Sequence, residues 1–234
     1  MLDSRRVTAQ QTLAAAPMLV GVPPDRVAEL EQAGARRRYP SGAFLFLEGD
    51  ESDSVHVILD GRVQVESTRD DGRTQLRAIL GPGQVLGELG VLAGIARTGG
   101  ALALDDVTTL RIPAEPFAAF IRNEPTAAEA MLRALALQVV HHEAMVEDLL
   151  FLDLRARVAK RLLALVSSSW TELPHNGVMS PANITQADLA SLCGGSRENV
   201  NRALAELQKR GLIARDGHRY VLKDVAGLRR VAKV

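Results

Sequence analysis

The residues best suited to chemistry lie between positions 87 and 98. This stretch reads Gly-Glu-Leu-Gly-Val-Leu-Ala-Gly-Ile-Ala-Arg-Thr, with three glycines, one acid and one arginine. Glycines let backbone N–H groups approach an anion, and a guanidinium can hold a phosphate through paired hydrogen bonds. The pattern indicates a site for a small anionic ligand around Arg97. The alternative, a glycine-rich loop in which Glu88 and Arg97 form a purely structural pair, fits the same residues.

Short apolar runs of period two surround this stretch. They begin near position 39 and are broken by turn signals at 42, 49, 60–61, 71–72 and 81–83, and residues 102–112 predict a further strand. Turns at such regular, short intervals are typical of an antiparallel roll or barrel. Residues 24–34 and 113–121 predict short helices. The candidate ligand stretch therefore interrupts a β-rich N-terminal region.

Residues 125–152 predict one long helix with an apolar seam. The seam positions follow spacings of four and three, and they are Ala128, Leu132, Leu135, Val139, His142, Val146 and Leu149. Such an a/d pattern predicts pairing with another helix, and a second copy of this chain is the expected partner. His142 is a polar exception in the seam. It either pairs with its counterpart across a dimer or contacts a ligand.

The clearest local signal is a pair of short helices near the C-terminus. Thr185 with Asp188 predicts a capping box, Gly194 and Gly195 predict the turn, and Ser196 caps a second helix that runs to about position 210. Val200, Leu204 and Leu207 form its buried stripe, opposite a polar face of Arg197, Glu198, Asn201 and Arg202. Residues 211–222 predict a hairpin wing, so the whole is a winged helix-turn-helix. An αα-hairpin with a solvated Glu198–Arg202 pair is the alternative.

Charge is divided unevenly along the chain. Residues 1–152 hold 14 Lys and Arg against 21 Asp and Glu, a net charge of −7, whereas residues 153–234 hold 14 against 7, a net charge of +7. A basic C-terminal region favours a polyanionic partner, nucleic acid first, although a chance imbalance of surface charge has the same appearance. A single cysteine, Cys193, excludes an internal disulfide. No apolar run is long enough for a membrane span, and a cytoplasmic protein is expected.

The chain resembles the cyclic AMP receptor protein (CRP/FNR) family of bacterial regulators from about position 19 to 228. The matching residues are Gly49-Asp50, Gly61, Gly83, Gly87-Glu88-Leu89 and Arg97-Thr98, which are similar to the phosphate-binding cassette and turns of its nucleotide domain. The resemblance implies that Arg97 grips a cyclic phosphate, that Glu88 takes the ribose 2′-hydroxyl, and that Thr98 completes the cradle with backbone from Gly87 and Leu89.

The same resemblance implies the DNA-contacting positions, which are Thr185, Ser196, Arg197, Glu198, Asn201 and Arg202. It further implies a homodimer, an inverted-repeat DNA site and RNA polymerase as partners. Arginine suits guanine and glutamate suits the cytosine amino group in the major groove.

Two departures from the family pattern concern the effector. Gly99 and Gly100 stand where small strand-forming residues are usual, and they could loosen the following strand. His142 and Glu143 occupy positions where members that respond to cyclic AMP place Thr with Ser or Asn against the adenine. Both side chains can hydrogen-bond a purine edge, but with another pattern of donors and acceptors.

Together these patterns predict an α+β protein with three parts. These are an effector-binding antiparallel β-roll at 1–124, a central dimerisation helix at 125–152, and a winged helix-turn-helix at 153–234. The predicted function is transcription regulation under the control of cyclic AMP or cyclic GMP; the alternative is the same fold with another effector, haem among them, or none. An enzyme is not expected, because no catalytic constellation or metal-ligand spacing is visible among the histidines and carboxylates.

Overall fold

The computed structural model describes residues 16–68, 74–167, 178–179, 185–216 and 219–234. The chain divides into two compact units, residues 1–139 and 140–234. The long helix α5 (Pro125–Phe151) contributes to both units.

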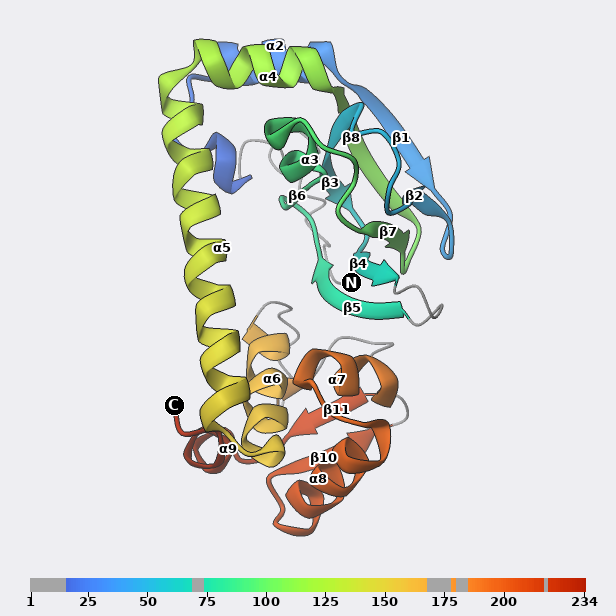
Figure 1. Ribbon diagram of the computed structural model, residues 1–234, viewed down its shortest axis with the longest axis vertical. Helices are drawn as coiled ribbons and strands as arrows, with labels where there is room; N and C mark the ends of the chain where they lie inside the picture. Colours follow the sequence, from blue (N-terminus) through green and yellow to red (C-terminus); the bar gives the residue numbers. More distant parts are fainter. Residues whose placement is uncertain (1–15, 69–73, 168–177, 180–184, 217–218) are drawn as a thin grey trace, which may run out of the picture. The chain divides into compact units, whose positions relative to one another are not determined.

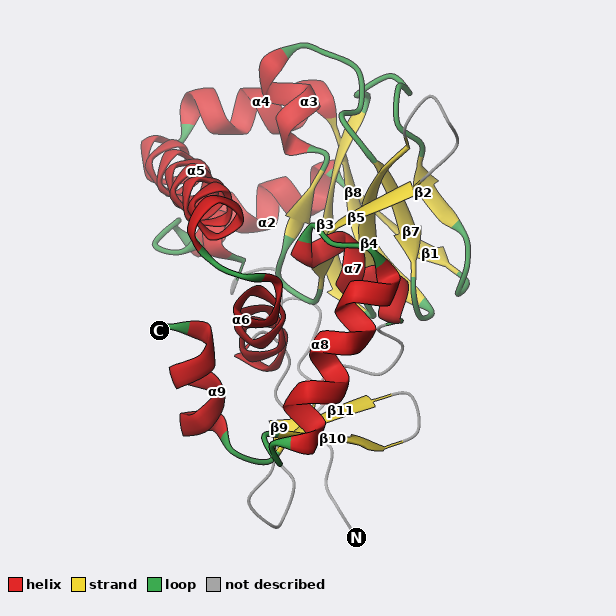
Figure 2. Ribbon diagram, turned by 60° about the horizontal axis from the view of Figure 1, so that its bottom comes forward, coloured by secondary structure: helices red, strands yellow, loops and turns green. Residues whose placement is uncertain are grey.

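The first unit contains two antiparallel sheets of four strands each. One sheet has the order β1-β8-β3-β6 and the other β2-β7-β4-β5. The strands are β1 (Ala35–Tyr39), β2 (Phe44–Phe46), β3 (Ser54–Asp60), β4 (Val63–Thr68), β5 (Thr74–Leu80), β6 (Val85–Leu86), β7 (Gly100–Ala103) and β8 (Val107–Pro113). The predicted β-roll is therefore confirmed, with its strands gathered as Figure 2 shows.

Helices close the first unit around an apolar core. They are the short turn η1 (Pro17–Leu19), α2 (Pro24–Ala33), α3 (Glu88–Ala93) and α4 (Ala114–Asn123), and α2 lies beside α4 in Figure 1. The β3 residues Val55 and Val57 are fully buried in this core with Phe117 of α4, and Ala127 and Met131 of α5 join them. Burial of such side chains is the main stabilising contribution to the unit.

The sequence prediction was wrong at two strands. Residues 102–112 form two strands rather than one, because Asp105 and Asp106 lie in the turn between β7 and β8. Asp105 accepts hydrogen bonds from Arg62 at 2.7 and 2.8 Å, and Asp106 accepts one from the Ser41 backbone at 3.1 Å. The edge strand β1 was missed because its consecutive arginines at 36–38 show no apolar alternation.

The second unit is the predicted winged helix-turn-helix. It contains α6 (Leu154–Ser167), β9 (Val178–Met179), α7 (Gln186–Cys193), α8 (Arg197–Lys209), β10 (Ile213–Asp216), β11 (Arg219–Leu222) and α9 (Val225–Ala232), with a small sheet of order β10-β11-β9. Val158 and Leu162 of α6 are fully buried. The sequence also predicts a turn-rich stretch at 170–182 and a hydrophobic staple at Ile184; of these residues only 178–179, which form β9, are among the described ones. The C-terminal helix α9, which packs on α6, was not predicted.

Candidate functional site

The candidate ligand stretch folds into a glycine turn and one short helix. Gly87 precedes α3 in the left-handed region, with φ of 85°, and Gly94 ends the helix with φ of 66°. A Cβ atom at Gly87 would lie 2.2 Å from Nη1 of Arg97. Glycine is therefore needed there both for its backbone angle and for the close approach of the arginine.

Arg97 is the buried cation of this cassette, with only 4% of its surface exposed. Its Nη1 donates to the Gly87 carbonyl at 3.1 Å, and its Nη2 donates to Oγ of Ser54 at 3.2 Å and lies 3.5 Å from Asp53. The guanidinium carbon lies 4.1 Å from the centre of the Phe46 ring, within cation–π range. Nε is buried without a hydrogen-bond partner. A buried, unsatisfied N–H of this kind is costly unless something accepts from it.

Glu88 supplies a buried carboxylate beside this arginine. It is 7% exposed, and burial raises its pKa, opposed by hydrogen bonds from backbone and from the Gln138 side chain and by the positive charge of Arg97. Among the described residues, Arg97 is ion-paired with Asp53 and not with Glu88. The structural Glu88–Arg97 pair, the alternative left open by the sequence, is therefore not formed. Glu88 is a hydrogen-bond acceptor in an apolar setting, which suits a ligand hydroxyl.

The other predicted ligand residues are accessible. Leu89 is 40% exposed, and Thr98 is exposed at the end of the cassette, where its carbonyl accepts from Nη1 of Arg77 at 2.8 Å. His142 and Glu143 are also exposed, and they lie on α5 within the second unit.

Sequence reasoning missed Gln138, which bonds to Glu88, and four residues of the β-roll that contact the cassette, namely Phe46, Asp53, Ser54 and Arg77. These four come from β2, β3, the turn before β3, and β5, so only the pairing of distant strands brings them together. No sequence motif includes these four residues of the β-roll. Asp53 and Ser54 are the last residues of a polar segment, 51–54, that follows Gly49-Asp50.

The two glycines after Thr98 have different environments. A Cβ at Gly99 would lie 2.8 Å from the backbone oxygen of Glu66, whereas at Gly100 the nearest atom would be 3.7 Å away. Glycine at 99 is therefore explained by the close passage of β4, while Gly100 has ordinary space around it. Strand β7 still begins at Gly100 and pairs with β4, so the expected loosening of this strand is not observed.

Both predicted caps of the helix-turn-helix are formed. Thr185 Oγ1 accepts from the Asp188 backbone N–H at 3.1 Å, and the Thr185 N–H donates to Asp188 Oδ2 at 2.8 Å, which completes a capping box. Gly194 makes the left-handed turn, and Ser196 Oγ accepts from the Asn199 N–H at 3.2 Å. These caps fix where α7 and α8 begin, and hence which side chains α8 presents.

The face of α8 opposite its buried stripe carries most of the predicted DNA contacts. Arg197, Glu198 and Arg202 are exposed, and Arg202 lies 3.7 Å from Glu198 and donates to Asn199. Asn201 differs from the prediction: it is only partly exposed, and its Oδ1 is buried without a partner. It lies one residue from the buried Val200, at the border of the stripe, so its side-chain oxygen faces protein rather than an open surface.

Arg157 of α6 donates hydrogen bonds to carbonyls at the ends of two helices of the second unit, α5 and α7. Its Nε donates to the Cys193 carbonyl at 2.8 Å, Nη1 to the Leu152 carbonyl at 2.8 Å, and Nη2 to the Gly194 carbonyl at 3.5 Å. These carbonyls lie at the ends of α5 and α7, where the helix dipole favours a cation. Cys193 itself is buried, and burial raises the pKa of its thiol to about 12, so it is an unreactive core residue.

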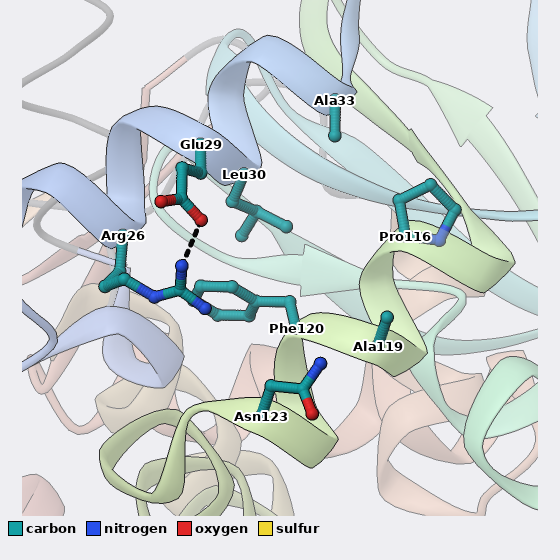
Figure 3. A pocket seen from close by; sticks show the side chains of 8 residues that line it. All are labelled: Arg26, Glu29, Leu30, Ala33, Pro116, Ala119, Phe120 and Asn123. Carbon is teal, nitrogen blue, oxygen red and sulfur yellow. Dashed lines mark hydrogen bonds and ion pairs between the residues drawn. The ribbon is translucent and has the colours of Figure 1, made fainter.

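A separate pocket lies between α2 and α4 (Figure 3). Arg26 stands at its edge, while Leu30 and Phe120 provide apolar walls. The Arg26 guanidinium is bonded to Glu29 and lies 3.4 Å from Glu124. Because its charge is already neutralised by carboxylates, this pocket is a poor anion site compared with the cassette.

Within the described ranges, no group of three or more His, Cys, Asp or Glu side chains is arranged to hold a metal ion. The same part of the chain contains no helix that is long and apolar enough to cross a membrane.

Comparison with known proteins accounts for both units. Residues 36–124 match the cyclic nucleotide-binding domain, and residues 156–231 match the Crp-like helix-turn-helix domain. A CRP-like cAMP-activated global transcriptional regulator of Mycobacterium tuberculosis is 32% identical over 224 residues, which cover 95% of this chain and 99% of that protein. The cyclic AMP receptor protein of Thermus thermophilus is 29% identical over 216 residues, covering 92% and 96%.

Solved structures agree with these matches. The Thermus thermophilus catabolite activator protein is 28% identical and covers 93% of this chain and 98% of its own, with a TM-score of 0.53. The regulator CLP of Xanthomonas campestris, described as responsive to c-di-GMP, has a TM-score of 0.74 at 23% identity and covers 86% and 99%, a likeness of fold. The chain belongs to the CRP/FNR family of transcription regulators. It is a CRP-like regulator with a cyclic nucleotide-binding domain and a DNA-binding helix-turn-helix, not an enzyme.

Proposed function

We propose that this protein is a homodimeric transcription regulator whose effector is a cyclic nucleotide, cyclic AMP or cyclic GMP, held in the cassette. The carrying observation is Arg97, a buried guanidinium with an unpartnered Nε beside the glycine turn. A singly charged cyclic phosphate would satisfy this N–H and neutralise the cation. Glu88 would accept from the ribose 2′-hydroxyl, and Thr98 would border the site with Gly87 and Leu89.

The proposed division of labour follows the three predicted parts of the chain. Residues 1–124 bind the effector, residues 125–152 pair two copies, and residues 153–234 bind DNA. Pairing is supported by the seam of α5, where Leu132, Val139, Val146 and Leu149 are each more than half exposed in a single chain. An isolated helix seldom leaves such a line of large apolar side chains in water. His142 and Glu143 would then act on effector choice.

Two recognition helices related by a two-fold axis would bind an inverted repeat whose half-sites are about 34 Å apart. Arg197, Glu198 and Arg202 would read base edges, since they are exposed polar side chains of α8 near its N-terminus. Such a regulator would work with RNA polymerase in the cytoplasm.

Calorimetry with cyclic AMP and cyclic GMP tests the effector. Arg97→Leu is expected to weaken binding by roughly 10- to 150-fold, because a hydrogen bond to a charged group contributes about 1.5–3 kcal/mol. Arg122→Leu is the matched control, since Arg122 is an exposed arginine on α4 that donates a hydrogen bond to Glu115. Circular dichroism of each variant establishes that the fold is kept. Unaltered affinity in a folded Arg97→Leu protein would contradict the proposal.

A regulator with another effector, or with none, is the second candidate. The observation that favours it is the set of internal partners of Arg97, since Gly87, Ser54 and Asp53 already occupy both of its terminal nitrogens. In that case neither cyclic nucleotide would bind the wild-type protein, while DNA binding would persist.

A further inference from the structure

Arg77 reaches the cassette because of an irregularity in strand β5. Strands β4 and β5 pair Val65 with Ala78 and Glu66 with Leu76, so Arg77 is an extra residue at a β-bulge. A bulge re-aims a side chain that regular pairing would direct elsewhere. The bulge turns the Arg77 guanidinium toward the cassette, where Nη1 donates to the Thr98 carbonyl at 2.8 Å.

The backbone beyond Thr98 leaves room for this arginine. A Cβ at Gly99 would lie 3.4 Å from Nη1 of Arg77, at the close end of ordinary van der Waals contact, so the guanidinium passes beside this glycine. Two guanidinium groups are therefore bonded to the backbone of the cassette: that of Arg97 to the Gly87 carbonyl and that of Arg77 to the Thr98 carbonyl. That of Arg97 is buried and held by three partners, whereas Arg77 is exposed, and one of its N–H groups is bonded to Thr98.

The two arginines suit different parts of one ligand. The buried Arg97 is placed for the phosphate, as proposed above, while the exposed Arg77 lies at the Thr98 end of the cassette, where Nη1 is bonded to the Thr98 carbonyl and the guanidinium has further N–H donors. A guanidinium fork pairs with two adjacent acceptors. Guanine offers O6 and N7 on one edge, whereas adenine offers N7 beside the N6 amino donor, which opposes an arginine N–H.

We propose that Arg77 reads the base of the effector and gives this protein a preference for a cyclic nucleotide with a 6-oxopurine, cyclic GMP, over cyclic AMP. This inference rests on the proposed function, because it assigns the base to a cassette that binds the cyclic phosphate. It makes Arg77 a specificity-determining residue that the sequence patterns did not single out.

Calorimetric titration of the full-length protein with cyclic GMP and cyclic AMP tests the assignment. The wild-type protein should bind cyclic GMP roughly 5- to 150-fold more tightly than cyclic AMP, since one bidentate arginine–guanine pair discriminates by about this range of factors. Arg77→Leu should lose the preference by weakening cyclic GMP alone. Arg77→Lys keeps the charge and a donor for Thr98 but lacks the fork, and it should also lose the preference.

Cyclic IMP separates the two edges of guanine. It carries the same O6 and N7 acceptors but no 2-amino group, so it should bind the wild-type protein nearly as tightly as cyclic GMP and should weaken equally in Arg77→Leu. Arg122→Leu, the exposed arginine on α4, should leave all three affinities unchanged.

Each contrary result has its own meaning. If the wild-type protein binds both nucleotides equally or prefers cyclic AMP, the base assignment is wrong while the proposed function stands. Equal weakening of both nucleotides in a folded Arg77→Leu protein would also overturn it, because Arg77 would then only support the Thr98 carbonyl. If the wild-type protein binds no cyclic nucleotide, the proposed function fails and this inference fails with it.

Discussion

His56 shows how strongly burial can alter the pKa of a side chain. It lies in β3, is 2% exposed, and its Nδ1 lies 3.1 Å from Thr109 Oγ1. Burial, together with the positive charges of Arg97 and Arg111 and only partly offset by the carboxylate of Asp53, lowers its pKa to about 3. The imidazole beneath the cassette is therefore neutral at every physiological pH, and it cannot add positive charge behind Arg97.

This burial predicts an acid sensitivity of the β-roll. In the unfolded chain His56 regains its ordinary pKa of 6.5, so the unfolded state takes up a proton as the pH falls below that value while the folded state does not. Its contribution to stability is present above pH 6.5 and is lost toward pH 3. Between pH 7.5 and 5.5 the free energy of unfolding should fall by about 1.4 kcal/mol from this group.

Urea unfolding of the wild-type chain and His56→Gln at both pH values measures this effect. Glutamine keeps a polar group near Thr109 but does not titrate, so the variant should lose about 1.4 kcal/mol less than the wild type over that range. The same pH dependence in both proteins would show that His56 is not the group responsible.

At this scale the sequence predicted some site residues and necessarily missed others. Glu88 and Arg97 stand out because a glycine-rich stretch with one acid and one arginine is unusual inside a β-rich region. Asp53 and Arg77 could not be found in this way, because their approach to the cassette depends on strand register and on a bulge. Register follows from which faces are buried together, and no local pattern encodes a one-residue insertion in β5.

At the scale of the elements, Gly99, the residue before β7, lies close to the backbone of β4 at Glu66. Gly99→Ala should destabilise the protein by about 1–3 kcal/mol, because the new methyl group would be 2.8 Å from the backbone oxygen of Glu66 and the strands would have to shift. Gly100→Ala is the matched control, with the nearest atom 3.7 Å away, and its stability should be unchanged or higher by up to about 1 kcal/mol.

Thermal and urea unfolding of the two variants side by side give the comparison. Equal stability of Gly99→Ala and Gly100→Ala would mean that β4 and β7 separate without cost, and the close-approach explanation for Gly99 would be wrong. Loss of cyclic nucleotide binding in Gly99→Ala alone would be a further consequence, because the Thr98 carbonyl would move.

Element boundaries were predictable where local chemistry defines them. The caps at Thr185 and Ser196 fix α7 and α8 by hydrogen bonds within four residues, and both helices begin where the sequence predicted. Strand β1 was not predictable in the same way. It is an edge strand whose four residues at 35–38 are all exposed, so no buried face leaves an alternating pattern in the sequence.

For the whole molecule, the decisive question is which face of α5 meets the second copy. Val139 lies on the predicted seam and Val140 lies one residue off it, yet their exposed fractions are nearly equal at 56% and 59%. Val139→Glu should weaken the dimer by roughly 100-fold or more, because a two-fold axis repeats the lost apolar contact and brings two carboxylates together. Val140→Glu carries the same change off the seam and should leave dimerisation nearly intact.

Sedimentation equilibrium across a range of protein concentrations distinguishes the two variants. A dimer that tolerates Val139→Glu but dissociates with Val140→Glu would place the contact on another face of α5. A wild-type protein that remains monomeric at micromolar concentration would contradict the proposed homodimer.

The three-way contact of Arg157 has a mechanical consequence for the second unit. The guanidinium of Arg157 donates to carbonyls at the ends of both α5 and α7. Neither helix end can therefore rotate relative to the other without breaking a hydrogen bond of Arg157. The ends of α5 and α7 are therefore expected to move together as one rigid group. Because α8 follows α7 through the turn at Gly194 and Gly195, we expect a rotation of the end of α5 to be passed on to the start of α8 within this unit.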